Sequence, residues 1–290
     1  MPPVRRLFDT LGFRRSEPKT FPPLKSRLVL GLVLNFDLGQ ILLGDDKATR
    51  YASFIRDILD GHTVFDKKVA ERLVGRMCWM SSFDDWGPAY LHTLYYCVYC
   101  SYGERQLMLN NSNKHPLAKR FASEIKYWQD RITKRVLWTV DAEPKAIRVI
   151  YTDSSQDFFG SYDCRENFVY ECIPDGLMGE PIVIKELHAV ETHIKRCGIS
   201  PHSGVLVLVV TDNQNVQSVL NKRYSKSKSI RSKWDSGLRP FLEKNGIRCR
   251  ALWTRSKANL PADMLSRRRL DIASNVLKLQ GMPITNQLHA

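Results

Sequence analysis

The sequence contains little that would place the chain in a membrane or in an oxidising compartment. No apolar run reaches the roughly 18 residues that a membrane-spanning helix needs. The N-terminal stretch is basic and interrupted by prolines, without the apolar segment of a signal peptide. The seven cysteines follow no regular spacing, so we expect reduced thiols. These absences favour an intracellular protein without a membrane partner, and they do not distinguish nucleus from cytoplasm.

The sequence also lacks a full set of ligands for a zinc site. Cys97 and Cys100 form one Cys-x-x-Cys pair, but no second cysteine pair or nearby histidine pair accompanies it. A structural zinc ion needs four such ligands. We therefore expect both cysteines to be small apolar positions in a tyrosine-rich helix.

Acidic residues are scarce relative to basic ones. The chain has 44 Lys and Arg against 30 Asp and Glu, a formal net charge of +14. Such an excess favours a polyanionic partner, with nucleic acid first, although a basic protein without such a ligand is an open alternative. The 290 residues, 43% of them hydrophobic, suffice for one large or two modest folded domains.

The pattern of apolar residues divides the chain into four segments. Residues 1–44 begin basic and proline-rich, and then predict two short strands around a turn at 37–39. Residues 45–142 are mainly helical, because the helical pattern runs from Asp45 to about Lys134 and changes near Val136. Residues 143–275 mix strands and helices, and residues 276–290 carry little pattern.

Residues 143–275 predict the order strand, strand, strand, helix, strand, helix, helix, strand, helix. Residues 204–212 are apolar on both faces, as a central buried strand is, and residues 229–246 read as a single helix. Antiparallel strands followed by a strand reached through a helix crossover imply a mixed sheet covered by helices. The predicted class is α/β (α+β).

Four acids lie where these elements end or begin. Asp153 ends the first strand, Glu186 lies in the first turn of the first helix, Asp212 ends the buried strand and Asp263 opens the last helix. Converging carboxylates repel one another unless cations neutralise them, and oxygen ligands suit Mg²⁺ or Mn²⁺. Such a set is what metal-dependent phosphodiester hydrolysis requires.

Each acid taken singly has a simpler interpretation. Asp153 is also a good turn residue, and Asp212 is also a good helix N-cap, a task that Asn213 or Asn215 can share. Asp263 suits the positive end of a helix dipole. Glu191 competes with Glu186, but five helical residues separate the two by roughly 140°, so both cannot face one site.

The stretches "YTDSS", "KELHAVETH", "VVTDNQNV" and "NLPADMLSRR", in this order, resemble the ribonuclease H domain of retroelement polyproteins over about residues 145–270. The nearest resemblance is to tyrosine-recombinase (DIRS-type) and gypsy-like elements. It implies a ribonuclease H-like five-stranded mixed sheet and hydrolysis of the RNA strand of RNA/DNA hybrids. It also implies two Mg²⁺ ions, with Mn²⁺ possible, on four residues that are both catalytic and metal-ligating: Asp153, Glu186, Asp212 and Asp263.

One departure from that family lies in the loop before the last predicted helix. Many members carry a histidine there, whereas this chain has "LWTRSKANLPAD". Either Arg255, Ser256 or Lys257 takes its part, or turnover is slow. A catalytically silent, domesticated binding or scaffold module with the same fold stays the alternative.

The upstream half resembles the last palm strands of a reverse transcriptase followed by its helical thumb and connection. We therefore expect the C-terminal part of a retroelement polymerase, with the remaining fingers-palm segment as a possible partner. Two acidic pairs, Asp45-Asp46 and Asp84-Asp85, lie at a helix start and between helices. Neither predicts a polymerase site, which needs its aspartates in a β-hairpin.

Basic residues gather in "NKRYSKSKSIRSKW" (221–234), which contains no acid. Phosphate contacts supply affinity without sequence readout, as an enzyme acting on any hybrid requires. A solvated charged loop is the alternative. The predicted nucleic-acid contacts are Lys222, Arg223, Lys226, Lys228, Arg231, Lys233, Asn213 and Arg255, and the run 267–269 is a further candidate.

Overall fold

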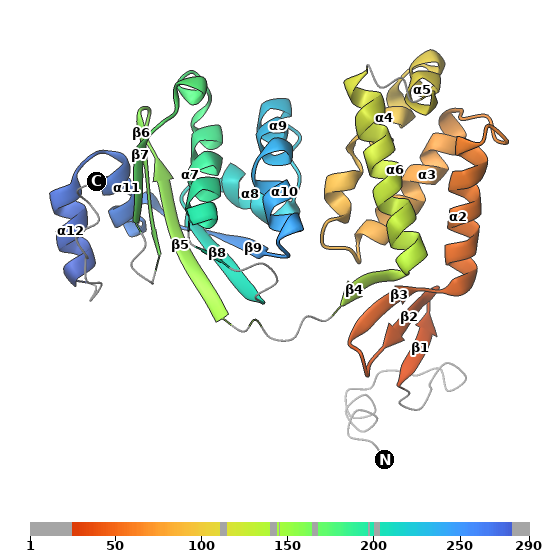
Figure 1. Cartoon of the computed structure of the whole chain (residues 1–290), viewed down its shortest axis with the longest axis horizontal. Helices are drawn as coiled ribbons and strands as arrows, with labels where there is room; N and C mark the ends of the chain where they lie inside the picture. Colours follow the sequence, from red (N-terminus) through yellow and green to blue (C-terminus); the bar gives the residue numbers. More distant parts are fainter. Residues whose placement is uncertain are drawn as a thin grey trace, which may run out of the picture. The chain divides into compact units, whose positions relative to one another are not determined.

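The computed structural model describes residues 25–110, 115–139, 144, 146–163, 168–196, 198–199 and 204–279 (Figure 1). They belong to two compact units, one formed by Met1–Asp84 and Thr93–Val140, the other by Asp85–His92 and Asp141–Ala290. No helix among the described residues is long and apolar enough to cross a bilayer. The expectation of an extended, proline-rich start lies outside the described residues.

The first unit contains a four-stranded antiparallel sheet in the order β1-β2-β3-β4. Its strands are β1 (Ser26–Val29), β2 (Leu32–Asn35), β3 (Gln40–Leu43) and β4 (Val136–Thr139).

One sequence prediction about this sheet is wrong. Two strands were predicted before residue 45, but the described residues 25–44 form three, because Leu30 and Gly31 both take positive φ and close a hairpin of their own. The last helix before β4 ends at Lys134, where the helical pattern was predicted to end. Arg135 follows in the left-handed conformation, with φ 61°, and the chain then pairs with β3.

The helices of this unit are α2 (Asp45–Leu59), α3 (Lys67–Ser81), α4 (His92–Tyr99), α5 (Tyr102–Leu109) and α6 (Pro116–Lys134). Asp66 caps α3 as predicted, because its Oδ1 accepts the backbone N–H of Val69 at 2.8 Å. Cys97 is buried in α4, and burial raises the pKa of its thiol to about 12. It therefore packs as an apolar side chain, as predicted.

Both acidic pairs of the upstream half are bound by basic side chains. Asp45 and Asp46 begin α2, and Asp46 pairs with Arg50 at 2.7 Å. Asp84 is buried and pairs with Arg131 at 2.8 Å. The Asp84-Asp85 pair lies before the short helix η2 (Gly87–Tyr90), outside any β-hairpin.

The second unit has a five-stranded mixed sheet in the order β7-β6-β5-β8-β9. The strands are β5 (Ala146–Ser154), β6 (Phe158–Asp163), β7 (Phe168–Cys172), β8 (Val205–Thr211) and β9 (Arg248–Trp253). The first three pair antiparallel, and β8 pairs parallel with both β5 and β9. The predicted class, α/β (α+β) with a mixed five-stranded sheet, flanking helices and a mainly helical region before it, is confirmed.

Helices cover both faces of this sheet (Figure 1). They are α7 (Ile182–Arg196), α8 (Gln214–Lys222), α9 (Lys228–Ser236), α10 (Leu238–Lys244), α11 (Leu260–Ser266) and α12 (Leu270–Leu279). The single helix predicted at 229–246 is wrong, because Gly237 breaks it with a non-helical backbone. A Cβ at Gly237 would lie 2.6 Å from Oε2 of Glu191, so glycine leaves the space for that side chain.

The core under α7 is built mainly from β-branched and aliphatic side chains, with one tryptophan: Ile150, Leu187, Val190, Val207, Val209, Val216, Leu220, Trp234 and Leu242. Polar residues also hold α7 in place. His193 and Ser161 share a 2.7 Å hydrogen bond, and Asp163 accepts from Arg148 at 2.6 Å. Burial lowers the pKa of His193, which keeps its imidazole neutral.

Candidate metal centre

Asp153 lies near the end of β5, opposite Gly160 of β6. Asp153 is only 7% exposed, and its Oδ2 accepts a 2.6 Å hydrogen bond from Oγ of Ser266. The turn after β5 is closed by Ser155, whose N–H and hydroxyl both bond to Phe158. A turn function therefore does not account for a buried acid at position 153.

Glu186 reaches the same place from α7. The sequence predicted Glu186 in the first turn of this helix. Because α7 begins at Ile182, Glu186 instead lies just after the first turn. Its two oxygens accept from Nδ2 of Asn213 at 3.0 Å and from Oγ1 of Thr211 at 3.1 Å.

Glu191 occupies another face of α7. It pairs with Lys195 at 2.6 Å and with Lys233 at 3.1 Å. These lysines hold the pKa of its carboxyl below the usual value although burial opposes them. The helical angle had predicted this separation of Glu191 from Glu186.

Asp212 follows directly after β8. The N-cap of α8 is its neighbour Asn213, whose Oδ1 accepts the N–H groups of Asn215 and Val216. Asp212 is therefore free of capping, and its Oδ2 instead accepts a 2.5 Å hydrogen bond from Oγ of Ser256. Of the three residues predicted to replace the loop histidine, Ser256 is the one that contacts an acid of the site.

Asp153, Glu186 and Asp212 converge. One carboxylate oxygen from each lies within 4.8 Å of the others. Burial first, and then the charges of neighbouring carboxylates, raise the pKa of Glu186 to about 8 and that of Asp153 to about 6. Two buried acids and one half-buried acid whose charges repel one another form a set of oxygen ligands that fits a hard divalent cation such as Mg²⁺.

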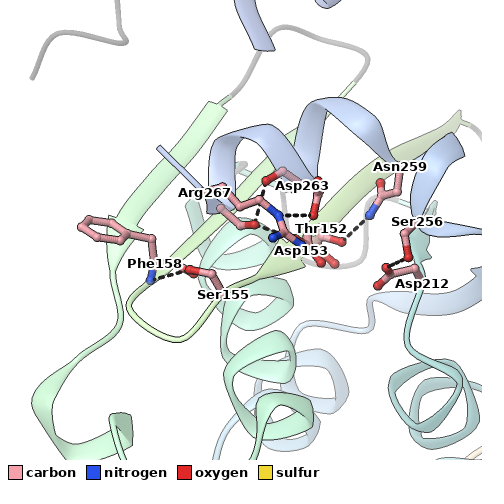
Figure 2. Close-up of polar contacts among 10 residues, drawn as sticks. Thr152, Asp153, Ser155, Phe158, Asp212, Ser256, Asn259, Asp263 and Arg267 are labelled. Atoms are coloured by element: carbon pink, nitrogen blue, oxygen red, sulfur yellow. Dashed lines mark hydrogen bonds and ion pairs between the residues drawn. The ribbon is translucent and has the colours of Figure 1, made fainter. Parts of the chain in front are cut away.

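Asp263 lies beside these three acids without joining them. It occupies the first turn of α11, and its Oδ1 pairs with Nε of Arg267 at 2.7 Å (Figure 2). Its charge still contributes to the raised pKa of Asp153. The structure therefore brings three predicted acids together and leaves the fourth adjacent, in an ion pair.

Close packing fixes the position of α11. A Cβ at Gly160 would lie 2.3 Å from Cβ of Leu265, so the helix rests directly on β6. Nδ2 of Asn259 donates to the backbone oxygen of Thr152 at 2.9 Å, next to Asp153. Sequence reasoning missed Asn259 and Ser266 as supports, although both lie within the quoted "NLPADMLSRR" stretch.

The predicted basic contacts divide into outward and inward side chains. Lys222, Lys226, Lys228 and Arg255 are exposed, and Arg231 is half-buried. Arg223 is only 2% exposed, because its guanidinium contacts Asp85 and lies 4.0 Å from the ring centroid of Trp86. Arg223 is therefore bound within the protein and is not available to a phosphate. Lys233 likewise pairs with an acid of the protein, Glu191.

No family model and no curated protein matches the chain. Similar solved structures include the foamy viral protease-reverse transcriptase with double-stranded DNA, at 12% identity and TM-score 0.32, covering 87% of this chain and 42% of that one. The same foamy viral enzyme with an RNA/DNA hybrid is 11% identical at TM-score 0.30, over 87% and 33%. LC11-RNase H1, isolated from compost by a metagenomic approach, is 15% identical at TM-score 0.31, over 43% and 96%. The chain thus spans less than half of the foamy viral chains, and likenesses this low assign it to no family.

Proposed function

We propose that the second unit is a metal-dependent ribonuclease H that hydrolyses the RNA strand of RNA/DNA hybrids. One observation carries the proposal: Asp153, Glu186 and Asp212, from β5, α7 and the end of β8, place ligand oxygens within 4.8 Å of one another. Among the described residues none of the three caps a helix or closes a turn, so neither role accounts for their convergence.

The proposed cofactor is Mg²⁺, with two ions held by these three acids and Asp263, and Mn²⁺ able to replace it. Divalent cations supply charge that activates a water molecule and stabilises the leaving oxygen of a phosphodiester. The surrounding residues orient the ligands: Ser266 holds Asp153, Ser256 holds Asp212, and Thr211 with Asn213 holds Glu186.

Nucleic acid as substrate is supported by charge. The net charge of +14 favours a polyanion. Phosphate contacts are proposed for four exposed basic residues: Lys222, Lys226, Lys228 and Arg255. The choice of a hybrid rests on the resemblance of the four quoted stretches to retroelement ribonucleases H. An RNA/DNA hybrid is distinguishable from DNA by its 2′-hydroxyl groups and groove shape.

We further propose that the chain is the C-terminal part of a DIRS-type or gypsy-like reverse transcriptase. In this view residues 1–44 end a palm, 45–142 form a thumb and connection, 143–275 form the nuclease and 276–290 a tail. The antiparallel β1-β4 sheet joined to α2–α6 supports the assignment. A fingers-palm segment would then be a partner.

The substrate claim is tested with a panel of labelled nucleic acids in Mg²⁺. We expect cleavage of RNA in an RNA/DNA hybrid, and intact RNA when the same strand is single or paired with RNA. Tight hybrid binding without cleavage in Mg²⁺ or Mn²⁺ would support the silent binding module instead. Equal binding to duplex RNA and hybrid would point to structured RNA as the ligand.

A further inference from the structure

The acid cluster is accompanied by a cation of its own chain. Arg267 follows Asp263 by one helical turn, and its Nε lies 2.7 Å from Oδ1 of Asp263. The charges of Asp263, Asp153 and Asp212 all raise the pKa of Arg267, so the guanidinium stands in the field of the whole cluster. Within the described part of the chain, this is the one ion pair recorded for the four acids.

The pairing separates Asp263 from the other acids. Ligand oxygens of Asp153, Glu186 and Asp212 lie within 4.8 Å of one another, whereas Asp263 is outside that group and pairs with Arg267. The backbone of α11 cannot easily move, because Leu265 packs on Gly160 and Ser266 bonds to Asp153. Any exchange at Asp263 must therefore occur by side-chain rotation.

Arg267 and Asp263 differ in how far their side chains are exposed to solvent. The side chain of Arg267 is 62% exposed, whereas that of Asp263 is 19% exposed. An exposed arginine loses little on leaving, since water solvates it and exposed ion pairs are weak. A divalent cation at the cluster offers Asp263 a stronger partner than one guanidinium.

We propose that Arg267 is a built-in counter-ion that occupies Asp263 while no divalent cation is bound and is displaced when the cation takes that carboxylate. The proposal rests on the proposed metal centre. Arg267 then acts as a positioning residue that competes with the metal, and it sets the cation concentration at which the site fills.

If Arg267 competes with the metal, its removal should increase Mg²⁺ affinity. If Arg267 only stabilised the site, its removal should decrease that affinity. Removing Arg267 frees Asp263, so Arg267→Gln should bind Mg²⁺ more tightly than a control that loses one positive charge elsewhere. Arg269→Gln is the matched control, because Arg269 is exposed two residues away and its side chain makes no hydrogen bond or ion pair with the residues that the structure describes. From the strength of exposed ion pairs we expect a dissociation constant about three- to fivefold lower for Arg267→Gln than for Arg269→Gln.

The experiment is isothermal titration of the full chain with Mg²⁺ alone, without nucleic acid, after circular dichroism has shown that each variant is folded. Equal or weaker binding by Arg267→Gln, compared with Arg269→Gln, would overturn the proposal. A double-mutant cycle adds a second test, since in an Asp263→Asn background the Arg267→Gln change should have no further effect on affinity. A gain that persists there would show that the competition does not act through Asp263.

These outcomes separate the counter-ion from the nuclease. A wild-type chain that binds neither Mg²⁺ nor Mn²⁺ would refute the metal centre and with it the counter-ion. The predicted affinity difference without any hybrid cleavage would leave the counter-ion in place and refute the nuclease. Equal Mg²⁺ affinities of Arg267→Gln and Arg269→Gln, in a chain that cleaves hybrid, would refute the counter-ion and leave the nuclease in place.

Discussion

Glu186 should make the metal-free protein less stable as pH rises. Its carboxyl is 4% exposed and stands beside two other acids, which raises its pKa from 4.5 to about 8. The folded state therefore holds a proton that the unfolded chain has already released. The contribution of Glu186 to stability is fully present below pH 4.5, falls between pH 4.5 and about 8, and stays lost above that.

The magnitude follows from proton linkage. Within that window the unfolding free energy falls by about 1.4 kcal/mol per pH unit for one proton, so Glu186 accounts for about 3 kcal/mol between pH 5 and pH 8. Glu186→Gln cannot ionise and removes this slope. Any mismatch of its amide with Thr211 or Asn213 shifts stability equally at every pH and leaves the slope unaffected.

The assay is urea denaturation in chelator at pH 5, 6, 7 and 8, read by hydrogen-exchange mass spectrometry of peptides covering β8, which report the second unit alone. We expect the advantage of Glu186→Gln over wild type to grow by about 3 kcal/mol across this range. Mg²⁺ at pH 8 should restore wild type and not the variant. An advantage that stays constant within about 1 kcal/mol from pH 5 to pH 8 would refute the reasoning.

Three further substitutions test the supports of the site. Ser266→Ala removes the hydrogen bond that lowers the pKa of Asp153, so Mg²⁺ affinity at pH 7, measured by titration calorimetry, should fall about fivefold, and unchanged affinity would contradict this. Gly160→Ala places a Cβ against Leu265 and should destabilise the second unit by about 2 kcal/mol in the same β8 assay. Unchanged stability would show that α11 does not pack directly on β6. Trp86→Ala leaves the buried guanidinium of Arg223 without its aromatic neighbour and should cost about 2–3 kcal/mol, whereas an unchanged urea midpoint for β8 would show that residues 85–92 do not support this unit.

The convergence of Asp153, Glu186 and Asp212 could be predicted from the sequence because the signals for their positions are local. An apolar run that ends on an acid marks a strand terminus, and this placed Asp153 and Asp212 at neighbouring ends of β5 and β8. Helical periodicity correctly separated Glu186 from Glu191. The position of Glu186 within its helix was predicted two residues too close to the start, because α7 begins at Ile182, before the amphipathic pattern becomes clear.

Long-range pairing was beyond sequence reasoning. Arg223 and Lys233 read as surface charges, because nothing local shows that Asp85 and Glu191 meet them. The third strand before α2 was missed for a local reason, since Leu30 is an uncommon residue at positive φ. Arg267 was assigned to an undifferentiated basic run, and its partnership with Asp263 is visible only once α11 is folded.

The central claim is that Asp153 is buried to hold a catalytic metal. The direct test incubates a 5′-labelled RNA annealed to DNA with wild type, Asp153→Asn and Asp157→Asn in Mg²⁺. Asp157 is an exposed acid of the same β5–β6 turn and serves as the matched control. We predict RNA cleavage by wild type and Asp157→Asn that chelator abolishes, and none by Asp153→Asn. Equal cleavage by both variants, or tight hybrid binding without cleavage by the wild type, would contradict the claim.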